Sequence, residues 1–142
     1  MELTATQKDF IASNRSAAMI TVGDDGFAKA VRVGVAVIDG QVWSSGTVDR
    51  VRTDRLRKDP KCTLFVFGPG YEALTLEANV SLIEGVDAVG KSVRLFRQMQ
   101  GRPEGPLSWY GEELDEESFR RTMVDQKRLI YVFDVVNAYG VE

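Results

Sequence analysis

Apolar residues recur at every second position over much of the chain, which is the period of half-buried β-strands. The clearest run is ALTLEANVSLI at 73–83, and its apolar face carries Leu74, Leu76, Ala78, Val80 and Leu82. Strand patterns are also present at 17–22, 28–38, 41–45, 62–67 and 128–136. The turn sequences GDDG and DG between the first three predict tight antiparallel hairpins.

Helical patterns occupy three other segments. A capping residue, Thr4 or Thr6, precedes a short amphipathic helix that ends near Asn14. Two longer helices are predicted at 87–100 and 115–127. The segment between them, GRPEGPLSWYGEEL, is rich in glycine and proline and is predicted to be a loop.

These elements favour a mainly β fold in a single domain of residues 1–142. About six strands, mostly joined by hairpins, indicate an antiparallel barrel with helices packed outside it. A parallel βαβ fold is disfavoured because the first three strands follow one another without helices between them.

The segment SSGTVDRVRTDRLRKDP at 44–60 concentrates five basic residues in a mildly acidic chain. If it is helical from Thr47, Val48, Val51 and Leu56 share one side, with Arg52 and Arg55 between them. Guanidinium groups on a buried side need an anion, which a ligand phosphate or a carboxylate of the protein could supply. The functional interpretation is a phosphate site, and the alternative is that these arginines pair with nearby aspartates.

A single cation also stands among small residues on the strand at 28–38. Ala30, Gly34 and Ala36 share its side with Arg32. This arrangement leaves room for a flat ligand against the backbone, and it equally fits a surface arginine on a solvent-facing strand. Arg32 and the segment from Ser44 to Arg52 could border one groove, with the strand at 41–45 between them.

Composition excludes several kinds of chemistry. The chain has no histidine and one cysteine, Cys62, which lies in an apolar run and is expected to be buried and inert. Metal sites and histidine-based triads are therefore not expected, and redox chemistry would depend on a bound cofactor. A net charge of −3, with aspartates among the basic residues, argues against a nucleic-acid partner. With no membrane-length apolar run and no signal-peptide pattern, we expect a cytoplasmic protein without a membrane partner.

The order of these parts resembles the pyridoxamine 5′-phosphate oxidase-like, flavin-binding split β-barrel superfamily. The resemblance is greatest to its actinobacterial branch that depends on the deazaflavin coenzyme F420. It covers nearly the whole chain, and its sharpest part is Arg50-Val51-Arg52 followed by Leu56-Arg57-Lys58-Asp59-Pro60. The resemblance implies a six-stranded antiparallel split barrel of Greek-key type.

The family resemblance also implies roles for individual residues. Arg50 and Arg52 would grip the cofactor phosphate, helped by Ser45, Gly46 and Thr47, and the strand with Arg32 and Val33 would flank the ring. Together with the groove, this predicts a cofactor site formed by Arg32, Val33, Ser44, Ser45, Gly46, Thr47, Arg50, Val51, Arg52 and Arg55. Trp109 and Tyr110 would contribute to a pocket for the ring or a small-molecule substrate, and the resemblance implies a homodimer with cofactor sites at the subunit interface.

Departures from the family pattern, together with an arginine-rich groove that suits a longer anionic tail, favour F420 over a flavin as the expected cofactor. Binders of flavin mononucleotide (FMN) often carry a lysine soon after the first arginine and a Ser-Arg-Lys phosphate motif, whereas this chain has Val35-Ala36 and Arg50-Val51-Arg52. The NAYGVE ending lacks the Arg/His residues of true pyridoxamine phosphate oxidases, so vitamin B6 oxidation is not expected.

Three functions remain open at this stage. The first is a reductase in which reduced F420, or alternatively FMN, delivers hydride to an electron-poor organic substrate. The others are a flavin or deazaflavin carrier without turnover, and a dimeric scaffold without cofactor. No catalytic acid is assigned.

Overall fold

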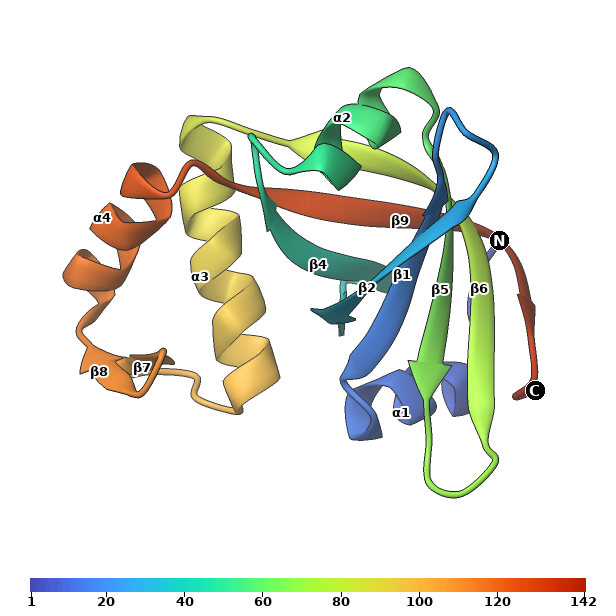
Figure 1. Ribbon diagram of the computed structural model, residues 1–142. Coiled ribbons are helices and arrows are strands. Elements are labelled where there is room, and N and C mark those ends of the chain that lie inside the picture. Colours follow the sequence, from blue (N-terminus) through green and yellow to red (C-terminus); the bar gives the residue numbers. More distant parts are fainter.

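A computed structural model describes all 142 residues and shows a curled antiparallel sheet with helices around it (Figure 1). The elements in chain order are α1 (Ala5–Ser13), β1 (Ser16–Val22), β2 (Ala28–Gly34), β3 (Ala36–Ile38), β4 (Gln41–Thr47), α2 (Val51–Lys58), β5 (Lys61–Phe67), β6 (Ala73–Ile83), α3 (Val86–Gln100), β7 (Leu107–Trp109), β8 (Glu112–Leu114), α4 (Glu116–Asp125) and β9 (Arg128–Tyr139). None of the helices combines the length and apolar character needed to cross a membrane.

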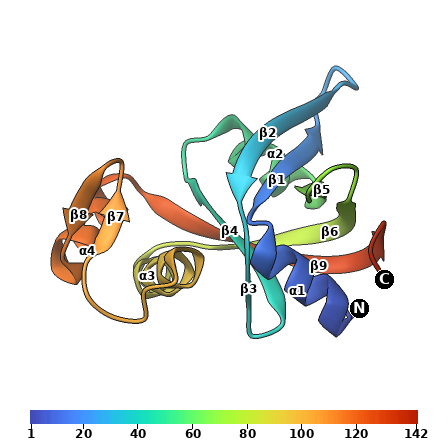
Figure 2. The same ribbon diagram turned by 90° about the horizontal axis from the view of Figure 1, so that it is seen from below.

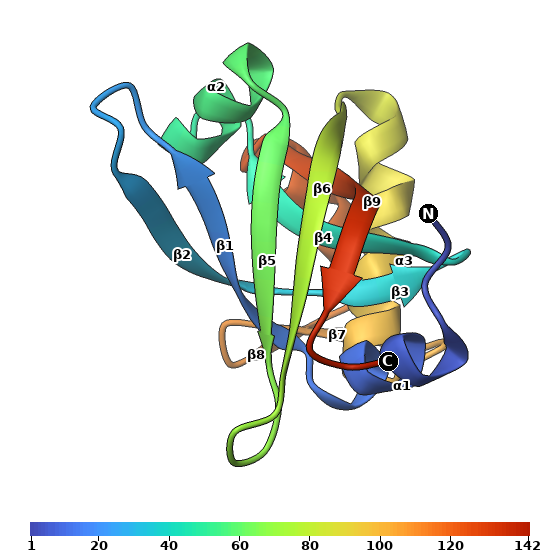
Figure 3. The same ribbon diagram turned by 90° about the vertical axis from the view of Figure 1, so that its right-hand side faces the viewer.

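The main sheet has seven strands in the order β2-β1-β5-β6-β9-β4-β3, so the prediction of six strands was wrong. The difference arises at Val35, where the predicted strand 28–38 is interrupted. Up to Gly34 it pairs with β1, and from Ala36 it pairs with β4. One residue therefore connects the two edges of the sheet, which the curl brings close together (Figure 3).

The concave side of the sheet holds the largest apolar core. The alternation predicted for β6 is confirmed, since Leu74, Leu76, Ala78 and Val80 are buried there. Cys62 is buried in the same cluster, and burial raises the pKa of its thiol to about 12. A thiol with such a pKa is almost wholly protonated at neutral pH, as expected for an inert cysteine.

Helix α1 covers one end of this core. Thr4 caps it by accepting a hydrogen bond from the Gln7 N–H at 3.1 Å, and the Gln7 side chain accepts one from the Thr4 N–H at 2.9 Å. Ile11 of this helix is fully buried in the core cluster. The predicted N-terminal helix and its capping residue are thus confirmed.

Helix α3 packs against the opposite face of the sheet and separates it from α4 (Figure 2). Leu95 of α3 forms one cluster with Trp43, Ile130 and neighbouring residues of β3, β4 and β9. Phe119 of α4 forms another with Val93, Leu107 and Met123. Through these clusters α3 and α4 form a helical layer on the outside of the sheet, as expected of helices packed outside a barrel.

The predicted loop 101–114 contains a small β-ribbon, β7–β8. Its turn is made by Tyr110 and Gly111, both with positive φ (47° and 82°), which is the requirement of a type I′ hairpin. Proline and glycine at 103–106 favoured a loop assignment, but the three-residue strands that follow are too short to show a period. Helix α4 also ends at Asp125 because Lys127 adopts a positive φ of 54° before β9 begins.

Helix α2 begins at Val51, four residues later than predicted, because β4 continues to Thr47, where it pairs with Arg128. Its buried residues are Thr53 and Leu56. Val51 is 64% exposed, so its predicted place on the buried side was wrong. Moving the helix start changes which residues face the sheet.

Candidate functional site

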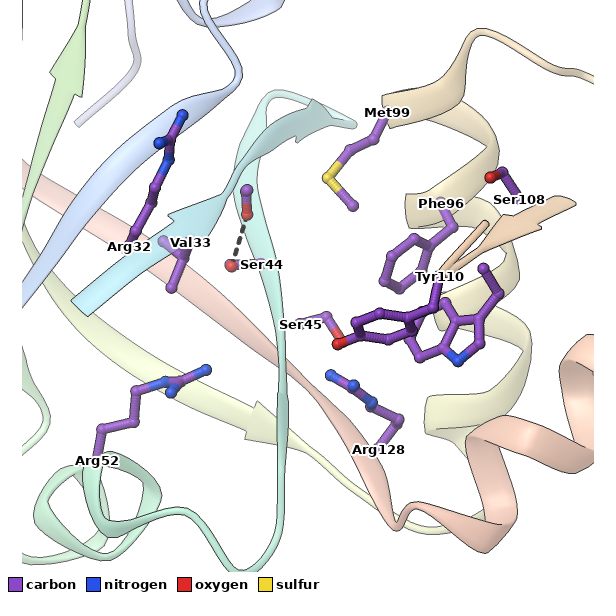
Figure 4. A pocket seen from close by; sticks show the side chains of 12 residues that line it. Arg32, Val33, Ser44, Ser45, Arg52, Phe96, Met99, Ser108, Tyr110 and Arg128 are labelled. Carbon is purple, nitrogen blue, oxygen red and sulfur yellow. Dashed lines mark hydrogen bonds between the residues drawn. The ribbon is translucent and has the colours of Figure 1, made fainter. Parts of the chain in front are cut away.

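A pocket of about 400 Å³ opens between the β2–β4–α2 part of the barrel and the helical layer (Figure 4). Residues far apart in sequence meet in it, because β9 lies beside β4 and carries the chain back from α4. The lining residues are Arg32, Val33, Gly34, Ser44, Ser45, Arg52, Phe96, Met99, Ser108, Trp109, Tyr110 and Arg128.

One wall of the pocket, which we call the barrel wall, is built from small and cationic residues of β2, β4 and α2. The Ser44 hydroxyl donates to the Gly34 carbonyl at 2.6 Å and ties β4 to the end of β2. Arg32 is held by two hydrogen bonds from its guanidinium to the Ser16 hydroxyl, at 3.2 and 3.0 Å. A Cβ atom on Gly34 would lie 3.2 Å from the Met99 sulfur, so glycine keeps this part of the pocket open.

The start of α2 is fixed by Thr53, on the buried side of the helix. Its buried hydroxyl donates to the Thr47 carbonyl at 2.8 Å and shares a second hydrogen bond with the Tyr131 hydroxyl. Gly46 makes this possible, because a side chain there would overlap the Tyr131 ring. The result is a rigid connection between β4, β9 and the helix turn that presents Arg52.

Arg52 and Arg128 point from opposite sides into the same space (Figure 4). The Arg52 guanidinium lies 5.8 Å from the Tyr131 ring centroid, and that of Arg128 lies 4.9 Å from the Trp109 centroid. Neither arginine has a carboxylate within 4.0 Å, and no Asp or Glu lines the pocket. The positive charge of the site is therefore not neutralised by the protein.

Two polar atoms at the pocket are buried without a hydrogen-bond partner: Ser45 Oγ and Arg52 Nε. Only one other side-chain atom in the whole chain, Ser92 Oγ, shares this condition. Buried donors without partners are costly, because folding removes them from water without replacing its hydrogen bonds. Their concentration in one pocket indicates a site built for a polar, anionic ligand.

Burial lowers the pKa of Arg128 from its ordinary value, and the positive charges of Arg50 and Arg52 lower it further. The Tyr110 hydroxyl acts in the opposite direction. Arginine stays charged even so, and mutual repulsion among these guanidinium groups would be relieved by a bound anion.

The other wall, the helical wall, is aromatic and apolar. Phe96, Trp109 and Tyr110 form edge-to-face contacts with centroids 5.0 to 5.3 Å apart. The Gln100 amide holds β7 to α3, because it donates to the Ser108 carbonyl and accepts from the Ser108 N–H, both at 2.9 Å. Such a surface suits a flat, apolar ring system.

The structure brings most of the predicted site residues together. The pocket is lined by Arg32, Val33, Ser44, Ser45, Arg52, Trp109 and Tyr110 from that prediction. Gly46 and Thr47 are buried beside the pocket and do not line it. Arg50 lies outside and donates to the Thr47 hydroxyl at 3.2 Å. Val51 and Arg55 line a different surface hollow, near Asp24 and Asp25.

Sequence reasoning missed four lining residues: Phe96, Met99, Ser108 and Arg128. Gly34, which also lines the pocket, was expected on the side of the strand that leaves room for a flat ligand. Phe96 and Met99 are three residues apart on a predicted helix, which is a signal for a shared face but not for what that face covers. Arg128 stands at the start of the last strand, where no sequence pattern marks it as a site residue. The pairing of β9 with β4 places it at the pocket.

No protein-family model and no curated protein matches the sequence. Solved structures do match over nearly its whole length. A conserved hypothetical protein, Rv2991 from Mycobacterium tuberculosis, has a TM-score of 0.72 and 22% identity, covering 96% of this chain and 84% of its own. A protein described as an F420 reductase has a TM-score of 0.70 and 15% identity, covering 97% and 98%.

A further match is a putative pyridoxamine 5′-phosphate oxidase from Listeria innocua, with a TM-score of 0.63, 12% identity, and coverage of 94% and 96%. The chain therefore has the fold of the pyridoxamine 5′-phosphate oxidase-like split β-barrel proteins, as the order of its parts predicted. At these identities the likeness is one of fold.

Proposed function

We propose that the pocket holds a flavin-type redox cofactor and that the protein is an oxidoreductase. The observation that carries this proposal is the coincidence of three guanidinium groups, no carboxylate and two unpartnered buried polar atoms in one pocket. The fold shared with an F420 reductase and with a putative pyridoxamine phosphate oxidase supports the same class of cofactor.

The residues divide into two roles in this proposal. Arg52, Arg128 and the Ser45 hydroxyl bind an anionic group of the cofactor, since charged hydrogen bonds to guanidinium groups are strong and directional. Phe96 and Met99 flank the ring from the helical wall. When bound, the cofactor supplies hydride to an electron-poor organic substrate, and the protein's part is to orient the partners and limit access of water.

F420 is our preferred cofactor, with FMN as the alternative. Arg50 lies at the turn before α2, and its charge acts on Arg128 together with that of Arg52. Basic groups both inside and just beyond the pocket suit a cofactor with a long anionic tail. A carrier that binds either molecule without turnover is the second candidate function, because no aspartate, glutamate or histidine that could transfer a proton lines the pocket.

Fluorescence titration of the purified protein with F420 and with FMN tests the cofactor. We expect binding of at least one at micromolar concentration, tighter for F420. Arg52→Ala should weaken it by about 10–100-fold, the range for removing a charged hydrogen-bond partner. Arg55→Ala, on the same helix but outside the pocket, is the matched control and should bind as the unaltered protein does.

Failure of both molecules to bind would overturn the proposed function, and equal losses in the two variants would overturn the site. Enzyme and carrier are separated by mixing the reduced complex with quinones and enones. Oxidation of the bound cofactor by one of these substrates supports an enzyme, whereas no oxidation by any of them supports a carrier.

We also propose that the protein is a homodimer that brings two cofactor sites to its interface. Cross-strand partners face the same side of a sheet, so Arg32, Ala18, Phe65, Thr75 and Tyr139 share the outer face. Phe65 and Tyr139 are 36% and 54% exposed there, and Ala18 lies between Phe65 and the pocket residue Arg32. Analytical ultracentrifugation should give a dimer, and Phe65→Glu a monomer; a monomeric unaltered protein would refute this assembly.

A further inference from the structure

A second pocket of about 600 Å³ lies outside the first site. Figure 1 shows that the start of α3 and the end of α4, which contribute to it, lie at the end of the helical layer nearest α2. It is formed where the residue after β4, the first turn of α3, the last turns of α4 and the start of β9 meet. The lining residues are Val48, Gly85, Val86, Val89, Arg120, Val124, Lys127 and Arg128. Its volume lies within the range of small-molecule sites.

The floor of this pocket is apolar and partly open to water. Four valines line it, and two of them, Val86 and Val124, are 91% and 60% exposed. A scattered exposed valine needs no explanation, but four that converge on one concave surface favour contact with an apolar ligand.

The rim carries positive charge without any Asp or Glu among the lining residues. Arg120 is already paired with Glu116, at 3.2 Å. Lys127 and Arg128 have no carboxylate within 4.0 Å. The pKa of nearby Asp49 is lowered chiefly by the hydrogen bond that it accepts from Thr47, and the charge of Lys127 lowers it further. Two cations therefore remain available on one side of an apolar floor.

We propose that this second pocket binds an apolar molecule that carries a carboxylate. Such a molecule would place its hydrocarbon part against the valines and its carboxylate at Lys127 and Arg128. Both contacts follow from complementarity: apolar area leaves water, and the anion meets unpaired cations. The proposal does not depend on the cofactor assigned to the first pocket.

Arg128 lines both pockets, so the two sites share one cation. An anion bound at either site competes for that guanidinium and repels an anion at the other. Binding of a carboxylate in the second pocket should therefore weaken binding of an anionic ligand in the first, and by linkage the effect is reciprocal.

Octanoate is the probe for a direct test, with octanol as its uncharged counterpart. In amide NMR spectra, octanoate at millimolar concentration should shift the signals of Val86, Val89, Val124 and Lys127. Octanol should bind at least about fivefold more weakly, since it lacks the charge that the two cations recognise. Absence of shifts at these amides, or equal binding of octanol, would overturn the proposal.

Variants sharpen this test without touching the first pocket. Lys127→Gln should weaken octanoate by about twofold to fivefold, the scale of one exposed charge. The matched control, Lys61→Gln, also removes an exposed lysine that forms no ion pair, and should change nothing.

Val86→Asp places a carboxylate in the second pocket. Position 86 is the first residue of α3, where an acidic side chain is tolerated because it interacts favourably with the helix dipole. It should abolish octanoate binding, and because the added carboxylate also acts on Arg128, it should weaken flavin or deazaflavin binding without abolishing it. Octanoate binding that persists in Val86→Asp would refute the site. If neither cofactor binds the unaltered protein, the octanoate result still stands or falls by itself.

Discussion

The two walls of the first pocket differ in chemistry and in origin. The barrel wall comes from 21 consecutive positions, 32–52, and offers guanidinium and hydroxyl groups on a closely hydrogen-bonded frame. The helical wall comes from α3 and the β7–β8 ribbon and offers aromatic rings and a thioether. One wall is therefore suited to recognise charge and the other shape, and we expect that each can be altered separately.

The largest effect is expected from Phe119→Ala. Phe119 is fully buried and supports the helical wall through edge-to-face contacts with Phe96 and Trp109, at 5.5 and 5.7 Å. Its loss should lower the free energy of unfolding by about 3–5 kcal/mol. Urea denaturation followed by Trp fluorescence measures this.

Hydrogen exchange then shows whether the walls are separate. Amides of α4 and β7–β8 should exchange faster in Phe119→Ala, while β5 and β6 keep their protection. Uniformly faster exchange across the sheet would show that the helical layer and the barrel unfold as one unit. Leu64→Ala, which empties a buried site in the barrel core, is the matched control and should loosen β5 and β6 instead.

A smaller effect is expected from Thr53→Val on the barrel wall. The substitution nearly preserves volume but removes the hydroxyl that bonds the Thr47 carbonyl and the Tyr131 hydroxyl. Leaving these buried groups without a partner should cost about 1–3 kcal/mol of stability. It should also reduce cofactor affinity, because α2 is no longer fixed where it presents Arg52.

Thr53→Ser separates the two consequences, since it restores the hydroxyl and loses only a methyl group. Recovery of cofactor affinity in Thr53→Ser would identify the hydrogen bonds as the positioning element. Equal affinity in all three proteins would show that Arg52 does not need this anchor.

Sequence reasoning predicted much of the barrel wall because its determinants are local. Hairpin turns, β-alternation and the Asp-Pro stop lie within a few residues of the groups they position. The exception is the register of α2: a helix assumed to start at Thr47 placed Val51 and Arg55 at the site, whereas β4 extends through Thr47 and shifts the helix start.

The helical wall could be predicted only in part, because its determinants are not local. Trp109 and Tyr110 stood out as aromatics in a Gly/Pro-rich segment, but Phe96 and Met99 needed the packing of α3 against the sheet. Arg128 needed the knowledge that β9 inserts between β6 and β4, which pairs Thr47 with a residue 81 positions later. Composition and periodicity contain no information about this pairing.

Gly34→Ala tests whether the two walls face each other as the structure indicates. The added Cβ would lie 3.2 Å from the Met99 sulfur, a tight contact with a flexible side chain. Cofactor affinity should fall by less than about tenfold, or 1.4 kcal/mol, with stability nearly unchanged. Met99→Ala in the same protein should restore part of the affinity.

The double-mutant cycle gives the coupling between Gly34 and Met99. Additive effects of the two substitutions would mean that the walls do not touch when the cofactor is bound. Gly23→Ala provides no such test, because its nearest neighbours, Lys29 and Asp25, lie outside the pocket.

The smallest effect concerns the outer side of α2, where Arg57 makes a two-pronged ion pair with Glu84. The hydrogen bond from Arg57 lowers the pKa of Glu84 below its ordinary value. A carboxylate whose pKa is lower in the folded state contributes stability above its unfolded pKa, about 4.3, and that contribution disappears as pH falls through the lower folded value.

Glu84→Gln should therefore destabilise the protein slightly at pH 7, where the pair is intact, and the difference from the unaltered protein should diminish below about pH 4.3. Thermal unfolding at pH 7, 5 and 3 measures it, with Glu104→Gln, an exposed glutamate outside any ion pair, as the control. Both side chains of the pair are more than a third exposed, so high salt should reduce the difference as well. A pH-independent difference would assign the effect to packing rather than to charge. Cofactor affinity at pH 7 should not change, because Thr53 and not this pair holds the turn that carries Arg52.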